Sequence, residues 1–321
     1  MRVAVTGATG FIGGAIAHRL ADAGHDVLAL GRATAGPEGI DYLRWDLAAP
    51  GPPPTALDGV DAVVHAAAHV AAWGDEARFR LVTVDGTRRL VDALRPDVRL
   101  VVIGSSSVYA PDGRTTPYRE ADGPVDSARY LAAYPRAKAA QDRLVTELRP
   151  DAVVLRPRVV WGPGDRTLLP RIEARIRHGV LVLPDGGRRP MSTTHVDSLA
   201  RVVEAAIARP SVSGPVNVAD ATPRSASELL AALFAARRRR LRIVPVPAAL
   251  VWAGATVVEA AWHSAHLHRE PPVTRYAVSA LATPIVLDLD RLHEELGIAP
   301  DADVEAGAAE LAASPLRPGV R

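Results

Sequence analysis

The sequence predicts an α/β protein in which a doubly wound parallel sheet carries a smaller C-terminal cap. Short apolar runs alternate with helical stretches over the first half of the chain, and a glycine-rich turn joins the first run to the first helix. From about residue 165 this alternation gives way to proline-rich connections. The 321 residues exceed what one hydrophobic core usually serves, which fits a main unit with an addition.

Each expected element follows from this alternation. Five runs are apolar on both faces, as strands covered by helices must be, and they lie at 3–5, 27–30, 62–64, 100–103 and 153–155. Crossover helices are expected at 14–23, 77–94 and 135–148. Later helices are expected at 168–177, 196–208, 226–238 and 248–262, and a strand at 215–218 is expected to return to the main sheet. We expect Trp252 and Trp262 on the buried face of the last helix.

Charge and composition exclude several classes of protein. The 38 basic and 36 acidic residues nearly cancel, giving a net charge of +2, so a general nucleic-acid binder is not expected. Cysteine is absent, which removes disulfides and thiolate nucleophiles, and the grouped His263, His266 and His268 lack a carboxylate framework for a metal site. Residues 1–6 enter a strand rather than a signal peptide, and the apolar stretch 247–262 is too short to span a membrane, so we expect a cytoplasmic location.

The turn after the first run has the form of a phosphate-binding loop. It reads Thr-Gly-Ala-Thr-Gly-Phe-Ile-Gly over residues 6–13. Gly7 allows a tight turn, Gly10 lets the backbone approach a pyrophosphate at the helix N-terminus, and Gly13 lets helix and strand pack closely. The loop therefore predicts a Rossmann-type dinucleotide site, formed by Gly7, Thr9, Gly10, Phe11, Ile12 and Gly13.

The end of the second run favours NADP(H) over NAD(H). An NAD site usually has a carboxylate there, which binds the ribose 2′-hydroxyl and repels a 2′-phosphate. This chain instead has Gly31 and Arg32, and a guanidinium pairs with a phosphate through two parallel hydrogen bonds. Asp46 and Leu47, after the third strand region, are expected to meet the adenine.

A tyrosine and the only lysine of the chain lie four residues apart. Tyr134 and Lys138 share one face of the third crossover helix, one turn from each other. The unperturbed pKa of a tyrosine is near ~10, and a nearby ammonium lowers it. The pair therefore predicts that Tyr134 transfers a proton and that Lys138 lowers its pKa.

A serine loop follows the fourth run, at the carboxyl edge of the sheet where ligands of such sheets bind. It contains Ser105, Ser106 and Ser107. A serine hydroxyl at this place can donate a hydrogen bond to a carbonyl oxygen as negative charge develops on that oxygen.

These motifs resemble those of the extended short-chain dehydrogenase/reductases, also called the NAD-dependent epimerase/dehydratase family. The resemblance extends over nearly the whole chain. Its further motifs are His-Ala-Ala-Ala at 65–68, Val-Asp-Gly-Thr at 84–87, Arg156-Pro157, the stretch 160–165 and His-Val-Asp at 195–197. Thr83 stands where the family usually has Asn, so a structural or proton-relay role of that Asn does not carry over.

The resemblance implies roles for individual residues. Ser105, with Ser106 as the fallback, would orient the substrate, Tyr134 would be the acid and base, and Lys138 would also hold the nicotinamide ribose. Further contacts with the cofactor are implied for Ala66, Ala67, Ala68, Pro157 and Val160. The family commonly dimerises through the helices that correspond to 77–94 and 135–148, which implies a homodimer.

Within the family, the segments 71–74, 160–169 and 271–276 resemble the subgroup of 3β-hydroxysteroid dehydrogenases, which act on apolar alcohols and ketones. The implied substrate pocket contains Trp73, Ser106, Ser107, Val159, Trp161 and His195, with Val160, Trp252 and Tyr276 as further candidates for its wall. For His195 the alternative is a hydrogen-bonded structural histidine.

The expected function is that of an NADP(H)-dependent ketoreductase or alcohol dehydrogenase acting on an apolar small molecule, steroid-like or a natural-product intermediate. The alternative is an NDP-sugar epimerase or dehydratase with retained NAD, and the missing acid at Gly31 counts against it. A protein that binds a dinucleotide without catalysis would leave the serine, tyrosine and lysine idle. We expect residues 1–164, with roughly 190–218, to bind the dinucleotide, and roughly 165–189 and 219–321 to form a substrate-binding cap.

Overall fold

A computed structural model describes residues 1–49, 55–166, 168–267, 269–283, 285–300 and 304–313. Its centre is a seven-stranded sheet of order β11-β6-β5-β4-β1-β2-β3, in which every pairing is parallel. The strands are β1 Arg2–Thr6, β2 Asp26–Gly31, β3 Asp41–Arg44, β4 Ala62–His65, β5 Arg99–Ile103, β6 Val153–Pro157 and β11 Gly214–Val218. The predicted doubly wound sheet is confirmed, and the strand expected at 215–218 pairs with β6.

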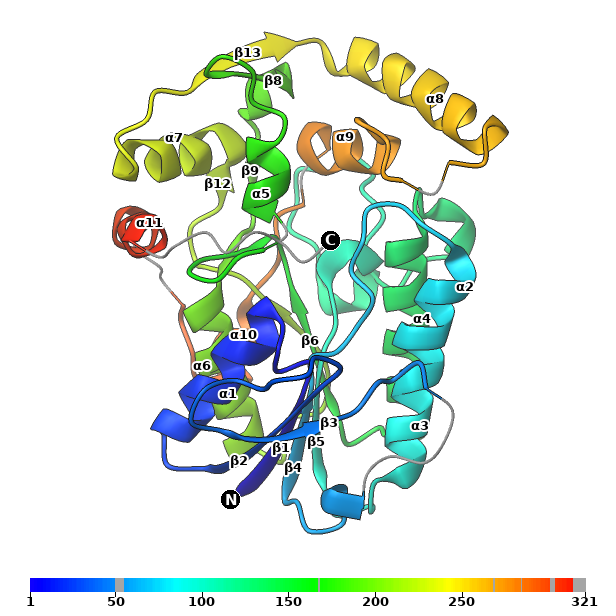
Figure 1. Ribbon diagram of the computed structural model, residues 1–321, viewed down its shortest axis with the longest axis vertical. Helices are drawn as coiled ribbons and strands as arrows, with labels where there is room; N and C mark the ends of the chain where they lie inside the picture. The colour runs from blue at the N-terminus through cyan, green and yellow to red at the C-terminus, as the bar shows by residue number, and fades with distance from the viewer. Residues whose placement is uncertain (50–54, 167, 268, 284, 301–303, 314–321) are drawn as a thin grey trace.

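Helices cover both faces of this sheet (Figure 1). One layer contains α1 Phe11–Asp22, α6 Val196–Ala208 and α10 Asp290–Leu296. The other contains α2 Glu76–Phe79, α3 Gly86–Ala93 and α4 Ala133–Leu148. Successive side chains of β1 point to opposite faces of the sheet. Val3 and Val5 pack with α1 and α6, whereas Ala4 packs with α3 and α4. This double burial explains why the strands read as continuous apolar runs.

The second crossover differs from the single helix expected at 77–94. Between α2 and α3 the chain forms a π-helical segment, Arg80–Asp85. Thr83 lies in it, is buried, and accepts a hydrogen bond from His69 N on its hydroxyl at 3.1 Å. Thr83 therefore ties this crossover to the segment that follows β4.

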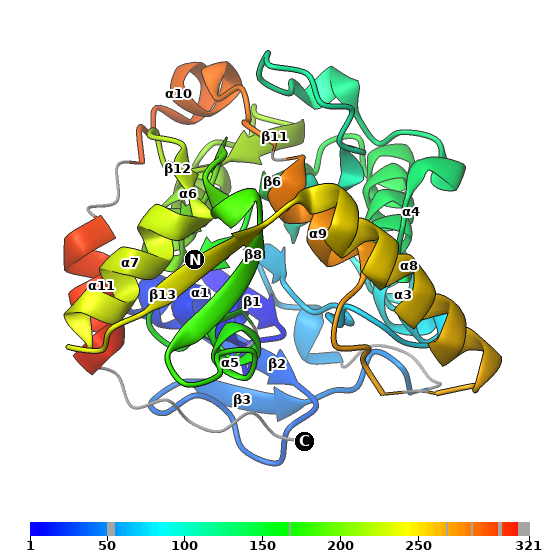
Figure 2. The ribbon, with the colours of Figure 1, turned by 90° about the horizontal axis from the view of Figure 1, so that it is seen from above.

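The cap contains helices and short strands above the carboxyl edge of the sheet (Figures 1 and 2). Its helices are α5 Leu168–Glu173, α7 Ala226–Ala236, α8 Ala248–Ser264, α9 Arg275–Ala282 and α11 Val304–Ala313. Its strands β8 Val180–Pro184 and β13 Arg242–Val246 pair in parallel, and β9 Pro190–Met191 pairs antiparallel with β12 Arg224–Ser225. Two further short strands, β7 Val160–Trp161 and β10 Thr194–His195, pair beside the main sheet.

Helix α8 is less buried than its composition suggests. It lies along the outer side of α9 (Figure 2), and only Ala255 and Glu259 are buried along its length. Trp252 is 38% exposed and Trp262 is half-buried, so the expectation of a buried tryptophan face is wrong. A helix that is apolar all round shows no preferred face, so its pattern could not show which side would be covered. No helix in the described residues is long and apolar enough to cross a membrane.

Candidate active site

The glycine loop forms a tight cradle at the start of α1. Gly7 has a φ of 71°, and a Cβ there would lie 2.8 Å from the backbone nitrogen of Ala67. A Cβ on Gly13 would lie 2.3 Å from the carbonyl oxygen of Gly7. Gly10 is the N-cap of α1 and offers no side-chain cap to the first turn, which also contains no acid. The cradle fits a pyrophosphate, because the free N–H groups of Phe11, Ile12 and Gly13 lie at the positive end of the helix dipole.

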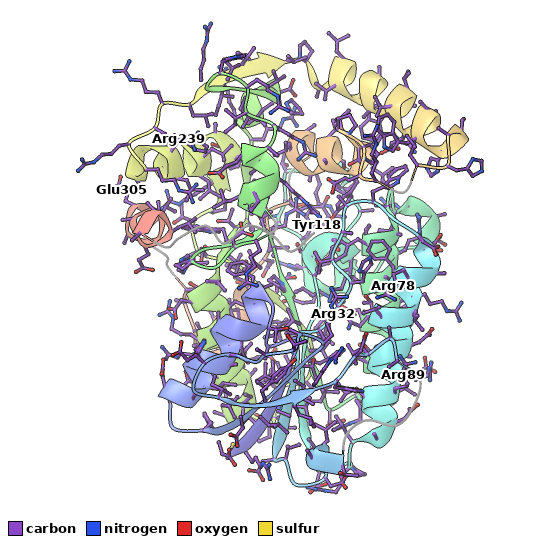
Figure 3. The ribbon with its side chains drawn as sticks, in the orientation of Figure 1. Arg32, Arg78, Arg89, Tyr118, Arg239 and Glu305 are labelled. Carbon is purple, nitrogen blue, oxygen red and sulfur yellow. The ribbon has the colours of Figure 1, made fainter. Side chains whose placement is uncertain are left out.

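The end of β2 has no room for a carboxylate. A Cβ on Gly31 would lie 2.8 Å from the hydroxyl oxygen of Thr9. Arg32 follows and is exposed, and Arg44 of β3 donates from Nε to the Arg32 carbonyl at 3.3 Å. Burial lowers the pKa of His69, and the positive charges of Arg78 and Arg32 (Figure 3) lower it further. Positive charge therefore gathers where the sequence predicts the adenosine ribose.

The remaining predicted cofactor residues line the same edge. Leu47 is buried beside Gly86, its carbonyl accepts from Arg89, and Asp46 caps the turn through Ala48 N at 2.9 Å. Three residues directly follow β4, and two follow or end β6: Ala66, Ala67, Ala68, Pro157 and Val160. All of them therefore lie at the carboxyl ends of strands, where a doubly wound sheet binds its ligand.

Ser105 and Tyr134 meet between β5 and α4. Ser105 N-caps a short 3₁₀ turn, and its Oγ accepts from Ser107 N at 3.1 Å. Tyr134 is the second residue of α4, with Pro135 in the first turn where no N–H partner is needed. Burial raises the pKa of the Tyr134 phenol, and the hydroxyl of Ser105 opposes this rise. The pKa of Tyr134 is therefore raised rather than lowered as the sequence predicts, with burial as the largest cause and the Ser105 hydroxyl as the opposing one.

Lys138 is held by fixed partners. Its Nζ donates to the carbonyl oxygen of Ile103 at 2.8 Å and to Oε1 of Gln141 at 2.9 Å. Burial lowers the pKa of Lys138 to about 7, and Asp142 acts in the opposite direction. An ammonium has three N–H donors, so one is left for another ligand.

A buried network extends this contact to the glycine loop. Gln141 donates from Nε2 to the hydroxyl of Thr87 at 2.8 Å, and that hydroxyl donates onward to the Thr83 carbonyl at 2.6 Å. The Thr87 oxygen must then accept from Nε2 of His65, also at 2.8 Å. The other ring nitrogen of His65 lies 2.7 Å from the hydroxyl of Thr6, the residue before Gly7.

A cavity of about 250 Å³ opens beside the start of α4. Trp73 and Phe79 lie on one side, and Glu259, Thr274 and Tyr276 of the cap lie on the other. Trp73 is fixed by a hydrogen bond to the Leu267 carbonyl at 3.3 Å and by contact with the His263 ring. The structure therefore places the predicted Trp73 and the candidate Tyr276 in one cavity, next to the helix that carries Tyr134.

Trp161 and His195 lie elsewhere, which corrects their expected place in the substrate pocket. Trp161 is fully buried among cap leucines, and its ring meets His195 edge-on at 4.8 Å. His195 lines a separate hollow between α6 and α11. Their sequence position after a strand end suggested the pocket, but β7 and β10 turn both side chains toward the cap core. Trp252, a candidate for the wall, is absent from the residues that line the cavity.

The other substrate candidates surround the catalytic serine or the end of β6. Ser106 and Ser107 are buried in the 3₁₀ turn, and the phenol of Tyr276 approaches Ser107. Val159 follows Arg158 with a φ of 41°, a conformation that a β-branched residue rarely adopts. Arg158 and Gln141 are not among the site residues that the sequence predicts, and His65 enters there only as the first residue of the motif at 65–68. A charged residue at the end of a buried strand was the available signal for Arg158.

Comparisons with known proteins show the family of the chain. The model of the NAD dependent epimerase/dehydratase family matches residues 3–219. A 2-alkyl-3-oxoalkanoate reductase of Stenotrophomonas maltophilia is 31% identical over 328 residues, which cover 98% of this chain and 99% of that protein. A 4-hydroxy-2-methyl-3-oxo-4-farnesyl-3,4-dihydroquinoline-1-oxide ketoreductase of Stigmatella aurantiaca is 28% identical over 309 residues, covering 93% and 92%.

A solved structure shares the fold. UDP-glucuronic acid 4-epimerase from Bacillus cereus, in complex with NAD, has a TM-score of 0.74 and 17% identity, and the match covers 98% of both chains. The chain therefore belongs to the NAD dependent epimerase/dehydratase family, the extended short-chain dehydrogenase/reductases, and is an NAD(P)-dependent oxidoreductase.

Proposed function

We propose that the protein is an NADP(H)-dependent ketoreductase that reduces the carbonyl of a largely apolar small molecule. The observation that carries this proposal is the meeting of Ser105 and Tyr134 beside the cavity that Trp73 and Tyr276 line. A bound nicotinamide would supply the hydride to the carbonyl carbon. The residues of the chain then have to hold the carbonyl oxygen and give it a proton.

Ser105 suits the first task. Its oxygen already accepts a hydrogen bond from Ser107 N, so its hydroxyl hydrogen is the part left to point at a substrate oxygen. A donor fixed before the reaction stabilises charge on the carbonyl oxygen without reorganisation.

Tyr134 suits the second task in the reductive direction. Burial raises the pKa of its phenol, so the phenol stays protonated at neutral pH and has a proton to give. As negative charge grows on the carbonyl oxygen, the phenol is the acid that neutralises it.

Lys138 acts mainly by position. Two of its N–H donors are fixed on Ile103 and Gln141, and we assign the third to the hydroxyls of the nicotinamide ribose. The ammonium would then hold the nicotinamide ribose close to Tyr134, which lies one helical turn away on α4.

The cofactor preference rests on charge at the end of β2. Arg32, Arg44 and Arg78 supply guanidinium groups, and the contact between Gly31 and Thr9 leaves no place for an acid. A 2′-phosphate would meet attraction there rather than repulsion. The glycine cradle, Asp46, Leu47, the three alanines after β4, Pro157 and Val160 would hold the remainder of NADP(H).

The relatives support a carbonyl substrate, since the names of two of them describe the reduction of 3-oxo compounds. We propose that residues 1–164 with roughly 190–218 bind the cofactor and that roughly 165–189 and 219–321 cap the substrate. A homodimer through α3 and α4 and a cytoplasmic location stay predictions.

The second candidate is an NDP-sugar epimerase with retained NAD, because solved structures of the same fold include a UDP-glucuronic acid 4-epimerase in complex with NAD and a protein in complex with UDP-glucose and NAD. One experiment separates the two. The purified protein is denatured and its released nucleotide analysed, and dissociation constants for NADPH and NADH are measured by fluorescence. A ketoreductase releases little nucleotide and prefers NADPH by about tenfold or more. Stoichiometric NAD in the denatured sample would contradict the proposal.

A further inference from the structure

Arg158 occupies a fixed place at the end of β6. Its backbone nitrogen donates to the hydroxyl of Thr194 at 3.2 Å, and that hydroxyl donates to the Arg158 carbonyl at 2.9 Å. Its side chain is only 7% exposed. The guanidinium is therefore held in the interior, directly before the strained Val159.

The guanidinium of Arg158 lacks the partners that a buried charge normally has. Its Nε and Nη2 are both buried and make no hydrogen bond to any described residue. No other arginine in the described part of the chain has two such nitrogens. A buried charge without partners is costly, and such groups occur where function requires them.

In Arg156, two residues earlier, the edge of the guanidinium formed by Nε and Nη2 binds a carboxylate. Arg156 is 1% exposed, and its Nε and Nη2 donate to the two carboxylate oxygens of Asp142 at 2.8 and 2.9 Å. Arg149 and Arg291 bind Asp151 and Glu295 through the same two nitrogens. In Arg158 this carboxylate-binding edge has no hydrogen-bond partner in the described part of the chain.

Among the described residues, no carboxylate contributes to the shifted pKa of Arg158. Burial lowers the pKa of the Arg158 guanidinium, and the titratable groups that raise it are the phenols of Tyr276 and Tyr118. Tyr118 (Figure 3) instead donates to Asp112 at 2.6 Å. A neutral phenol beside the guanidinium does not compensate its charge.

Tyr276 connects Arg158 to the active site. It lines the cavity beside α4. Burial raises the pKa of its phenol, and Tyr134, Arg158 and Ser107 also shift this pKa, so all three lie near it. Arg158 therefore lies one side chain away from the groups that hold the carbonyl. A substrate anion separated from the carbonyl by a short link would reach it.

We propose that Arg158 binds a carboxylate of the substrate through Nε and Nη2, so that the enzyme selects 3-oxo acids over neutral ketones. This inference rests on the proposed carbonyl reduction. In a 3-oxo acid one carbon separates the reacting carbonyl from the carboxylate. Binding the carboxylate at Arg158 would hold the carbonyl beside Ser105 and Tyr134 and fix which face receives the hydride.

The test compares an acid with its ester. The full-length protein oxidises 3-hydroxyoctanoate or methyl 3-hydroxyoctanoate with NADP⁺, and kcat/KM is measured for each. The variants are Arg158→Met, which keeps the volume without the charge, Arg158→Lys, which keeps the charge without the paired donors, and Arg239→Met as an exposed control. Dissociation constants for NADP⁺ are measured for every variant.

The wild type is expected to prefer the acid. In Arg158→Met the ratio of kcat/KM for acid to ester falls about tenfold or more, mainly through KM, while Arg158→Lys recovers part of it. Arg239→Met keeps the wild-type ratio. An unchanged ratio in Arg158→Met overturns the inference. An equal loss of NADP⁺ affinity overturns it too, because Arg158 would then bind a cofactor phosphate.

Failure of the proposed function has a different signature. If the wild type oxidises neither compound, calorimetry with NADP⁺ present still measures binding of 3-hydroxyoctanoate and of its ester. Binding of the acid by the wild type and its loss in Arg158→Met support the carboxylate site on their own. Equal binding by both proteins contradicts it.

Discussion

The ammonium of Lys138 lies 2.9 Å from the side-chain oxygen of Gln141, and through this contact the catalytic helix is joined to the glycine loop. Gln141 bonds to Thr87, Thr87 to His65, and His65 to Thr6, with every distance between 2.7 and 2.8 Å. The network crosses the sheet interior from α4 to β1. It fixes the position of the lysine relative to the glycine loop, which a reaction between cofactor and substrate requires.

The directions of the hydrogen bonds place a proton on Nε2 of His65. The only hydroxyl hydrogen of Thr87 goes to the Thr83 carbonyl, so Nε2 of His65 must donate to the Thr87 oxygen. Nδ1 lies 2.7 Å from the hydroxyl of Thr6, which donates to it when the ring is neutral. Burial, with Lys138 adding to it, lowers the pKa of His65 to about 3.

We predict that this histidine makes the protein sensitive to acid. In the unfolded chain a histidine takes up a proton below about 6.5, whereas folded His65 does so only near 3, so the unfolded state binds more protons in between. The free energy of unfolding should fall with decreasing pH in this window, by about 1.4 kcal/mol per pH unit from this residue. Denaturant titrations of wild type and His65→Gln at several pH values measure it.

The variant should lose this part of the slope while also being less stable at pH 7. His18→Gln, on the exposed side of α1, is the matched control and should keep the wild-type slope. Equal slopes in wild type and His65→Gln would show that His65 is charged in the folded protein.

Tyr134→Phe should bind NADPH as the wild type does and lose about 10²-fold or more in turnover, because the proton donor is gone. Tyr130→Phe is the control from the segment just before α4, where the phenol donates to the Val108 carbonyl at 2.7 Å. That variant should lose about 1 kcal/mol of stability and keep its turnover. Stopped-flow or steady-state rates of the two variants are compared with the wild-type rate. A fully active Tyr134→Phe would show that Tyr134 does not donate the proton.

Arg32→Ala should weaken NADPH binding by about tenfold, or about 1.4 kcal/mol, and leave NADH binding nearly unchanged. The loss is limited because Arg44 and Arg78 also lie near this place. Fluorescence titration with both cofactors measures the effect, and Arg239→Ala is the exposed control. If the two cofactors lose affinity equally, Arg32 does not read the 2′-phosphate.

The two arginines at the end of β6 should respond to the same substitution in opposite ways. Arg156→Met leaves the buried carboxylate of Asp142 without its cation and should cost about 3 kcal/mol or more. Arg158→Met removes a buried charge whose Nε and Nη2 have no hydrogen-bond partner among the described residues, and it should leave the free protein as stable or more stable. Thermal unfolding of both variants checks this prediction. A large loss of stability in Arg158→Met would show that the Arg158 guanidinium has a partner in the folded protein.

The main sheet, the glycine loop and the Tyr134–Lys138 pair could be predicted because each depends on residues close in sequence. Buried parallel strands read as apolar runs, and a pair four apart on a helix lies on one face whatever surrounds it. The strand at 215–218 could be placed in the sheet for the same reason.

Other features depend on contacts between distant segments. Trp161 and His195 end the short strands β7 and β10, but Trp161 packs in the cap core and His195 lies against its ring beside a separate hollow. Helix α8 is apolar all round, so its exposure could not be read from its pattern. The free edge of Arg158 exists because no acid from any described segment reaches it, which only the assembled fold shows.

The central claim is that the protein transfers a hydride from NADPH to a ketone and releases both products. The most direct test incubates it with NADPH that carries deuterium at both C4 positions of the nicotinamide and with 2-methyl-3-oxooctanoate or its methyl ester, followed by mass spectrometry. We predict one deuterium on the carbinol carbon of the alcohol, in equal amount to NADP⁺ released, and formation of this alcohol about 10²-fold or more slower with Tyr134→Phe. Alcohol without deuterium, or no alcohol from a protein that retains NAD, would contradict the account.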